Sequence, residues 1–109
     1  MQDAPAPYYR INKFVVPPQS RDAMLGLIQL THGALRRQTG FVRDLILERQ
    51  SAPGECNIIT LIEFTGTDVV PQITAVLDAL ETQTGINRKE RADQLGVRSD
   101  MAGYRRLEI

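Results

Sequence analysis

The sequence predicts an α+β domain of the ferredoxin-like type, a split β-α-β arrangement in which two long helices cover one face of an antiparallel sheet. Two observations carry this prediction. Segments of alternating apolar and polar residues are twice interrupted by segments with helical spacing, which gives the order β-α-β-β-α-(short α)-β. The length of 109 residues suits one domain with one core.

The first strand is expected at YYRINKFVV, residues 8–16, because this segment is rich in β-branched and aromatic residues. It ends before Pro17 and Pro18, which cannot donate to a sheet ladder. Residues 1–7, where Ala alternates with Pro near the end, predict a flexible N-terminal arm. The folded domain is therefore expected to span residues 8–109.

A helix should follow over residues 21–38, where apolar side chains recur at helical intervals. Ser20 stands at the position of an N-cap, and Gly40 supplies the left-handed conformation with which helices commonly end. Because a Gly adopts this conformation without steric penalty, the chain can reverse directly into a second strand. That strand is expected over residues 41–50.

The second and third strands carry apolar residues on both faces. In the second strand, alternation divides these side chains into Phe41, Leu45 and Leu47 on one face and Val42 and Ile46 on the other. The third strand, CNIITLIEF at residues 56–64, follows the turn-forming SAPGE in a predicted hairpin. Burial on both faces is typical of a central strand, so the face without helices should also be covered.

Two helices and a strand complete the order. The second long helix should run from about Val69 to Leu80 and end at Gly85. Asn87 followed by Glu90 resembles a capping box for a short polar helix that ends near Leu95, whose charges are expected to face solvent. The last strand is expected in MAGYRRLEI, residues 101–109.

Composition excludes several classes of function. Thirteen basic and thirteen acidic residues leave no net field to attract nucleic acid or an anionic membrane. The single Cys56 allows no internal disulfide or cysteine-based metal cluster and fits a reducing compartment. The N-terminus does not resemble a secretory signal, and no segment approaches the roughly 20 apolar residues of a membrane span. A cytoplasmic protein is expected.

A homodimer is the first hypothesis for the helix-free face, because an identical sheet is the economical cover for it. At ~25 cal/mol per Å², burying ~500 Å² of apolar surface per chain contributes on the order of 10 kcal/mol before the entropy of association is subtracted.

The pattern INKFVVPP, the long helix up to RRQTGFV, and NIITLIEF are together similar to the antibiotic biosynthesis monooxygenase family. The similarity covers nearly the whole chain from Tyr8 onward and includes QLGV and the final strand with Tyr104. The resemblance implies a dimeric α+β barrel, two sheets packed face to face, with a separate pocket in each subunit between its sheet and its helices. It also implies that no metal or organic cofactor is needed, as in many members.

Asn12 is the catalytic candidate, because family oxygenases that act on polycyclic aromatics or haem often place an Asn on the first strand. A carboxamide can donate to a substrate oxygen and accept from a hydroxyl, so Asn12 could hold a phenolate beside oxygen. The alternative is an Asn whose side chain binds nearby backbone. Phe14 shares its face by alternation and is expected to contact the substrate.

Thr60, Ile62 and Phe64 are substrate-binding candidates on one face of the third strand. Phe64 stands where the family often has a Trp, and Thr60 where some quinone-forming members have an Asn. Phe64 can stack on a flat ligand or serve as a core aromatic, and Thr60 can offer a hydroxyl. The His that haem-degrading relatives carry on the second helix has no counterpart, which disfavours haem degradation.

His32 and Tyr104 complete the candidate set. An imidazole can act as a base, but no carboxylate stands three or four residues after His32 to orient it, so a solvated His is expected. The Tyr104 hydroxyl could point to a ligand or to the dimer interface.

Two functions follow from this set. One is a cofactor-independent monooxygenase for a small phenol or quinol. The other is a non-catalytic dimer that binds a small apolar ligand or serves in interactions, which the loss of the Trp favours.

Overall fold

The computed structural model describes residues 6–50 and 56–109, and within them the predicted order of elements is confirmed. The long elements are β1 (Tyr8–Val16), α1 (Arg21–Leu35), β2 (Phe41–Glu48), β3 (Cys56–Phe64), α2 (Val70–Thr84), α3 (Arg88–Gln94) and β4 (Arg98–Arg105). Single 3-10 turns, Pro18–Ser20 and Thr67–Val69, precede α1 and α2. Most of the predicted N-terminal arm and the whole SAPGE turn lie outside the described residues.

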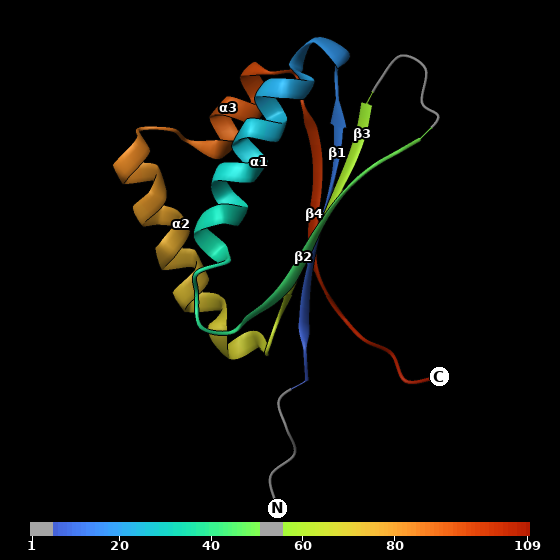
Figure 1. The fold of residues 1–109 in the computed structure, drawn as a ribbon, viewed down its shortest axis with the longest axis vertical. Coiled ribbons are helices and arrows are strands. Elements are labelled where there is room, and N and C mark those ends of the chain that lie inside the picture. The colour runs from blue at the N-terminus through green and yellow to red at the C-terminus, as the bar shows by residue number, and fades with distance from the viewer. Residues whose placement is uncertain (1–5, 51–55) are drawn as a thin grey trace, which may run out of the picture.

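The four strands form one antiparallel sheet in the order β2-β3-β1-β4, and the helices pack on one of its faces (Figure 1). This is the ferredoxin-like α+β fold that the sequence predicts. Strand β1 lies between β3 and β4, so Asn12 has Thr60 opposite it on one side and Met101 on the other. The other face of the sheet has no helical cover (Figure 1).

Gly40 allows the tight passage from α1 to β2. The helix ends at Leu35, earlier than predicted, and the chain turns through residues 36–39 before Gly40 adopts a φ of +94°. A Cβ atom at Gly40 would lie 2.6 Å from Val69 Cγ1, so the close approach of the 3-10 turn also requires a glycine here.

A β-bulge near the start of β2 makes one expected face assignment wrong. Phe41 pairs with Phe64, but the next paired residue is Arg43, opposite Glu63, so Val42 is an extra residue. The bulge returns Phe41 to the helix side, while Leu45 and Leu47 remain exposed on the open face. Phe41 therefore does not share a face with Leu45 and Leu47, because simple alternation fails at a bulge.

The elements that flank the sheet differ in detail from the expectation. Ser20 occupies the N-cap position of α1 without making a side-chain cap bond, because its hydroxyl donates instead to the Leu95 carbonyl at 2.7 Å. The cap of α3 is confirmed, since Asn87 Oδ1 accepts from the Glu90 amide at 3.0 Å. Strand β4 begins at Arg98, before the predicted residue 101. The Ser20 bond ties the end of α3 to the start of α1.

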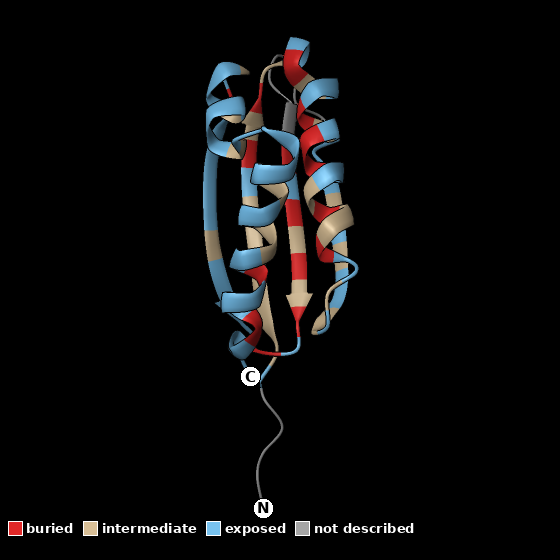
Figure 2. Ribbon diagram, turned by 90° about the vertical axis from the view of Figure 1, so that its left-hand side faces the viewer, coloured by how far each residue is buried: buried red, intermediate tan, exposed pale blue. Residues whose placement is uncertain are grey.

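The core consists of two hydrophobic clusters between the helices and the sheet. One cluster lies between the start of α1 and the upper end of the sheet in Figure 1. It contains Phe14, Val16, Met24, Leu27, Ile28, Ile58 and Val97. The other packs α2 and the end of α1 against the opposite end and contains Leu35, Ile62, Phe64, Val69 and Ile73. Figure 2 shows buried residues along α1 and the central strands of the sheet. None of the described helices is long and apolar enough to cross a bilayer.

Candidate active site

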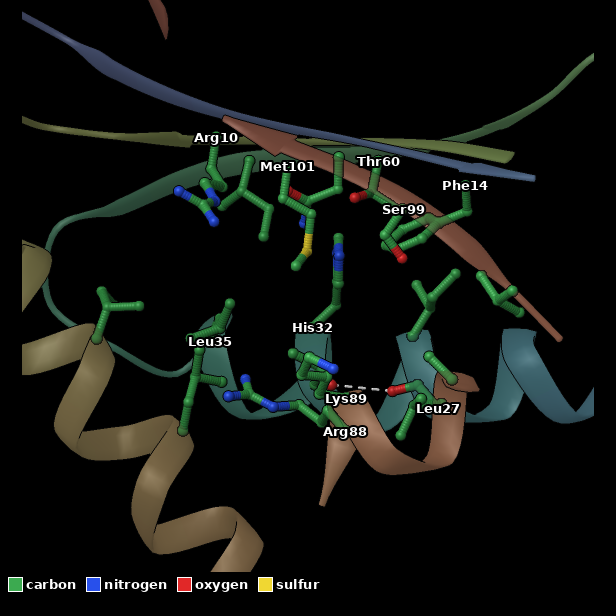
Figure 3. Close-up of a pocket in the computed structure, with 18 of the residues that line it drawn as sticks. Arg10, Phe14, Leu27, His32, Leu35, Thr60, Arg88, Lys89, Ser99 and Met101 are labelled. Carbon is green, nitrogen blue, oxygen red and sulfur yellow. Dashed lines mark hydrogen bonds between the residues drawn. The ribbon is translucent and has the colours of Figure 1, made fainter. Parts of the chain in front are cut away.

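A cavity of about 810 Å³ lies between the sheet and the helices (Figure 3). Its sheet side comes from β1, β3 and β4, and its helix side from α1, α2 and α3. The sequence did not predict that α3 lines the pocket, and from the last strand it predicted Tyr104 as a pocket residue. Arg88, Lys89 and Asp93 of α3 line the cavity. Lys89 and Asp93 are also largely exposed, as expected for the charges of this helix, whereas Arg88 is partly buried. A volume of this size falls in the usual range for small-molecule sites.

Asn12 and Thr60 face each other across β1 and β3 in the wall of the cavity. Asn12 Oδ1 and Thr60 Oγ1 are buried, and neither finds a hydrogen-bond partner among the described residues. Buried polar atoms in folded proteins normally have a partner, so a ligand or water is the expected partner here. The carbonyl oxygen of Asn12 thus accepts from no backbone N–H among the described residues.

His32 corrects the expectation of a solvated histidine. The residue is 3% exposed, and Figure 3 shows its side chain extending from α1 toward the sheet within the cavity. His32 Nδ1 lies 2.8 Å from Asp44 Oδ2. The orienting carboxylate comes from β2 rather than from the next helical turn, so helical spacing could not reveal it.

The contact with Asp44 fixes the role of each imidazole nitrogen. A carboxylate can only accept, so Nδ1 donates to Asp44 and neutral His32 keeps a lone pair on Nε2. Arg36 also donates to Asp44 Oδ2, from Nε at 2.9 Å. A histidine oriented by a carboxylate has the arrangement of a general base.

The pKa of Asp44 lies below its ordinary value. Burial raises this pKa, but the hydrogen bonds from Arg36 and His32, together with the charges of both groups, lower it by more. Asp44 is therefore ionised near neutral pH and available to accept from His32 Nδ1. The bulge in β2 contributes to this geometry, because it places Asp44 opposite Ile62 on the helix side.

Aromatic and aliphatic side chains make up most of the remaining wall. Phe14, Ile62 and Phe64 line the cavity and are also buried members of the core clusters. The rings of Phe64 and Tyr8 stack with their centroids 6.2 Å apart. Phe64 is thus both a core residue and part of the cavity wall, the two places that the sequence allowed for it.

Tyr104 does not belong to this cavity. It lies opposite Tyr9 on the face of the sheet away from the helices, where it is 41% exposed. The assignment of Tyr104 as a substrate-binding residue of the pocket is therefore wrong, because Arg98, Ser99 and Met101 are the residues of β4 that line it.

Arg10 is a further residue of the cavity, and it was not among the candidates predicted from the sequence. This residue lines the cavity from β1, two positions before Asn12 on the same face of the strand. Alternation from Asn12 would have found it. No group of three His, Cys, Asp or Glu residues that could hold a metal ion occurs within residues 6–50 and 56–109.

Comparison with known proteins reveals similarity in structure. SnoaB, a cofactor-independent oxygenase from Streptomyces nogalater, is 16% identical, with a TM-score of 0.64 over 95% of this chain and 96% of that one. The chain shares the fold of cofactor-independent oxygenases. A "putative antibiotic biosynthesis monooxygenase" from Nitrosomonas europaea is 13% identical, with a TM-score of 0.62 over 98% and 96% of the two chains.

A dimeric ferredoxin-like protein from an uncultured marine organism is 9% identical, with a TM-score of 0.64 over 95% of this chain and 99% of that one. Neither a family model nor a curated protein matches the sequence. The resemblance to the antibiotic biosynthesis monooxygenases and their dimeric α+β barrel is thus confirmed for the fold. At these identities the likeness carries no information on substrate or activity.

Proposed function

We propose that this chain is a cofactor-independent monooxygenase that oxidises a small phenol or quinol in the cavity between the sheet and the helices. One observation carries the proposal. Two buried polar atoms without partners among the described residues, on Asn12 and Thr60, share an otherwise largely apolar cavity with a carboxylate-oriented histidine. Acceptors for a hydroxyl, a base to deprotonate it and apolar walls are the parts that such a reaction needs.

Each residue has a separate task in the proposed reaction. The substrate hydroxyl donates to Asn12 Oδ1 or Thr60 Oγ1, and His32 Nε2 removes a phenolic proton while Asp44 stabilises the imidazolium. The Asn12 amide group donates to the developing phenolate. Phe14, Ile62 and Phe64 hold the ring and exclude water.

The substrate itself supplies the electrons. For 1,4-dihydroxynaphthalene the balanced reaction consumes one O₂ and gives 2-hydroxy-1,4-naphthoquinone and one water. One oxygen atom forms the new C–O bond, and the other leaves as water with the two hydrogen atoms that the quinol loses.

A non-catalytic dimer that binds a small apolar ligand is the second candidate function. Phe64, which replaces the Trp frequent in the family, is 3% exposed and stacked on Tyr8, so its ring serves the core as much as the cavity. In this case Asn12 and Thr60 would bind a ligand that leaves unchanged.

We also propose a homodimer formed through the open face of the sheet. Leu45, Leu47, Ile59 and Tyr104 are exposed apolar or aromatic side chains on that face. An identical sheet would cover them, and the similar marine protein is dimeric. A cytoplasmic location stays a prediction from the sequence.

Oxygen uptake under ¹⁸O₂ with 1,4-dihydroxynaphthalene tests the proposed reaction. We expect one ¹⁸O atom in the hydroxynaphthoquinone and no accumulation of peroxide, at a rate well above the uncatalysed reaction. His32→Gln should lower kcat by about 10²–10⁴-fold, the usual contribution of a general base. Gln29→Ala, at an exposed position of the same helix, should leave the rate unchanged. Unlabelled naphthoquinone with peroxide at the background rate would contradict catalysis and favour the binding function.

A further inference from the structure

Arg10 is a cation in the cavity wall for which the proposed reaction has no use. Its side chain enters from β1 on the helix side of the sheet, as Figure 3 shows. The structure places no carboxylate of the described residues within ion-pair distance of its guanidinium. Arg10 is partly buried, and an arginine that becomes fully buried is normally paired, so a ligand that covers Arg10 should bring an anion to it.

Three other basic side chains of the wall lie beside a carboxylate, although Arg88 Nε is buried without a hydrogen bond among the described residues. Arg88 pairs with Glu81 at 3.5 Å, Lys89 with Asp93 at 3.1 Å, and His32 with Asp44 at 2.8 Å. Glu81 and Asp93 offset the charges of Arg88 and Lys89, so the guanidinium of Arg10 adds a positive charge to the wall that no carboxylate of the described residues pairs with. The potential inside the cavity is therefore positive and favours an anion.

We infer that the ligand of this cavity is a hydroxyaryl carboxylic acid, whose carboxylate pairs with Arg10 while its hydroxyl meets Asn12 and Thr60. The inference rests on the proposed function for the placement of the hydroxyl. A neutral aromatic that filled the cavity would strip water from the guanidinium and leave a buried charge unpaired, whereas a carboxylate would pair with it.

The geometry of β1 fits a ligand of this kind. Residues two apart on one strand face are separated by about 7 Å, so Arg10 and Asn12 offer a cation and a carboxamide at a spacing of one or two aromatic rings. Ile62 pairs with Arg10 across the strands and lines the same wall, and the stacked rings of Tyr8 and Phe64 lie one step farther along. The aromatic part of the ligand would lie on this apolar surface.

The chemistry of the guanidinium selects a carboxylate among anions. Its planar fork matches the two oxygens of a carboxylate in a bidentate pair. Arg88 and Lys89 each lie beside a carboxylate, so Arg10 adds one unpaired positive charge, which the single negative charge of a carboxylate balances. A carboxylate is therefore the group that completes the cavity.

Equilibrium fluorescence titration with 6-hydroxy-2-naphthoate and its neutral methyl ester tests the inference. We expect the wild-type protein to bind the acid at least ~10-fold more tightly than the ester, as a charge-assisted bidentate pair implies. Arg10→Gln should abolish this preference and leave the affinity for the ester unchanged, which also shows that the variant cavity is intact. Lys13→Gln removes a positive charge from the exposed face of the same strand and should change neither affinity.

Equal affinity of the wild-type protein for acid and ester would overturn the inference, as would the absence of binding by both. The same holds if Arg10→Gln weakens both ligands alike. The proposed oxygenase function fails separately. Acid binding through Arg10 without oxygen uptake would support the inference and refute the oxygenase function. Oxygen uptake without any preference for an acid would support the oxygenase function and refute the inference.

Discussion

The two faces of the sheet are built from the same strands but differ in their side chains. The helix side contains buried polar atoms without partners in the described part of the chain, and the open side contains exposed apolar side chains. On the helix side, apolar residues enclose polar atoms of Asn12 and Thr60 that have no partner among the described residues. On the open side, Leu45 and Leu47 are 46% and 52% exposed without a helix to cover them. Because side chains alternate along a strand, one sequence forms both a cavity on the helix side and an apolar surface on the open side.

This difference indicates what each face is for. Buried polar atoms without partners destabilise a fold unless something binds them, so the helix side is expected to be completed by a small molecule. Exposed apolar side chains on a sheet favour association, so the open side is expected to be completed by a protein surface. Substitutions on the helix side should therefore affect folding or ligand binding, and substitutions on the open side should affect assembly.

The largest effect is expected for Ile62→Asp on the helix side. Ile62 is buried in a core cluster, and an unpaired carboxylate there costs several kcal/mol against a typical domain stability of about 5–15 kcal/mol. The variant should lose its cooperative thermal transition in circular dichroism. Ile62→Val, which keeps the site apolar, should cost only about 0.5–1.5 kcal/mol. A thermal midpoint of Ile62→Asp within a few degrees of wild type would refute the helix-side core.

Leu47→Asp on the open side should act on assembly and leave the subunit folded. We expect the wild-type protein to remain dimeric in light scattering across a hundredfold dilution from the micromolar range. Leu47→Asp should weaken the dimer by at least ~10-fold, or about 1.4 kcal/mol, because it introduces charge into the interface. Gln83→Asp, at an exposed position of α2, should stay dimeric. A folded wild-type monomer at micromolar concentration would exclude the dimer.

Asp44→Asn should produce a smaller, pH-dependent loss of stability. The substitution weakens the acceptor for His32 and Arg36, at a cost of about 1–3 kcal/mol near neutral pH. Since the folded-state pKa of Asp44 is lowered, its contribution is present above the unfolded value of about 3.9 and is lost as pH falls through the folded-state pKa. Denaturation at several pH values should show the gap to wild type closing on acidification. A gap that is the same at all pH values would contradict an ionised Asp44, and Asp78→Asn on the exposed side of α2 is the control.

The smallest effect on stability is expected for Thr60→Val. The hydroxyl is buried without a partner in the described chain, so removing it should leave the free energy of unfolding unchanged or raise it by up to about 1 kcal/mol. Oxygen uptake or ligand affinity should nevertheless fall. A clear loss of stability in chemical denaturation would show that the hydroxyl serves the fold and would remove Thr60 from the site.

The sequence predicted most of the fold, because alternation along β1 and β3 is regular and the turns carry Gly and Pro. The face shared by Asn12, Phe14, Thr60, Ile62 and Phe64 followed from that alternation. Phe41 was misplaced because a bulge cannot be read from alternation. Tyr104 was misplaced because β4 has a weak pattern with a Gly inside it, where Tyr8 lies against Gly103.

The contacts between helices and strands could not be predicted from the sequence. His32 and Asp44 are twelve residues apart on a helix and a strand, so only the packing of α1 on the sheet brings them together. The same holds for α3, whose polar sequence gave no sign that Arg88 and Lys89 line the cavity. Arg10, in contrast, could have been predicted from the sequence, because it lies two residues before Asn12 on the same face of β1.

Asn12→Ala gives the most direct test of the claim that the helix-side face is a binding site for an aromatic molecule. A thermal melt and a titration with 6-hydroxy-2-naphthoate should be measured on the same preparation, with oxygen uptake from 1,4-dihydroxynaphthalene alongside. Because Asn12 Oδ1 has no partner among the described residues, we expect little change in the thermal midpoint. Ligand affinity should fall by about 1–3 kcal/mol and oxygen uptake should fall with it. A lowered thermal midpoint with unchanged affinity and uptake would contradict this account, because Asn12 would then serve the fold alone.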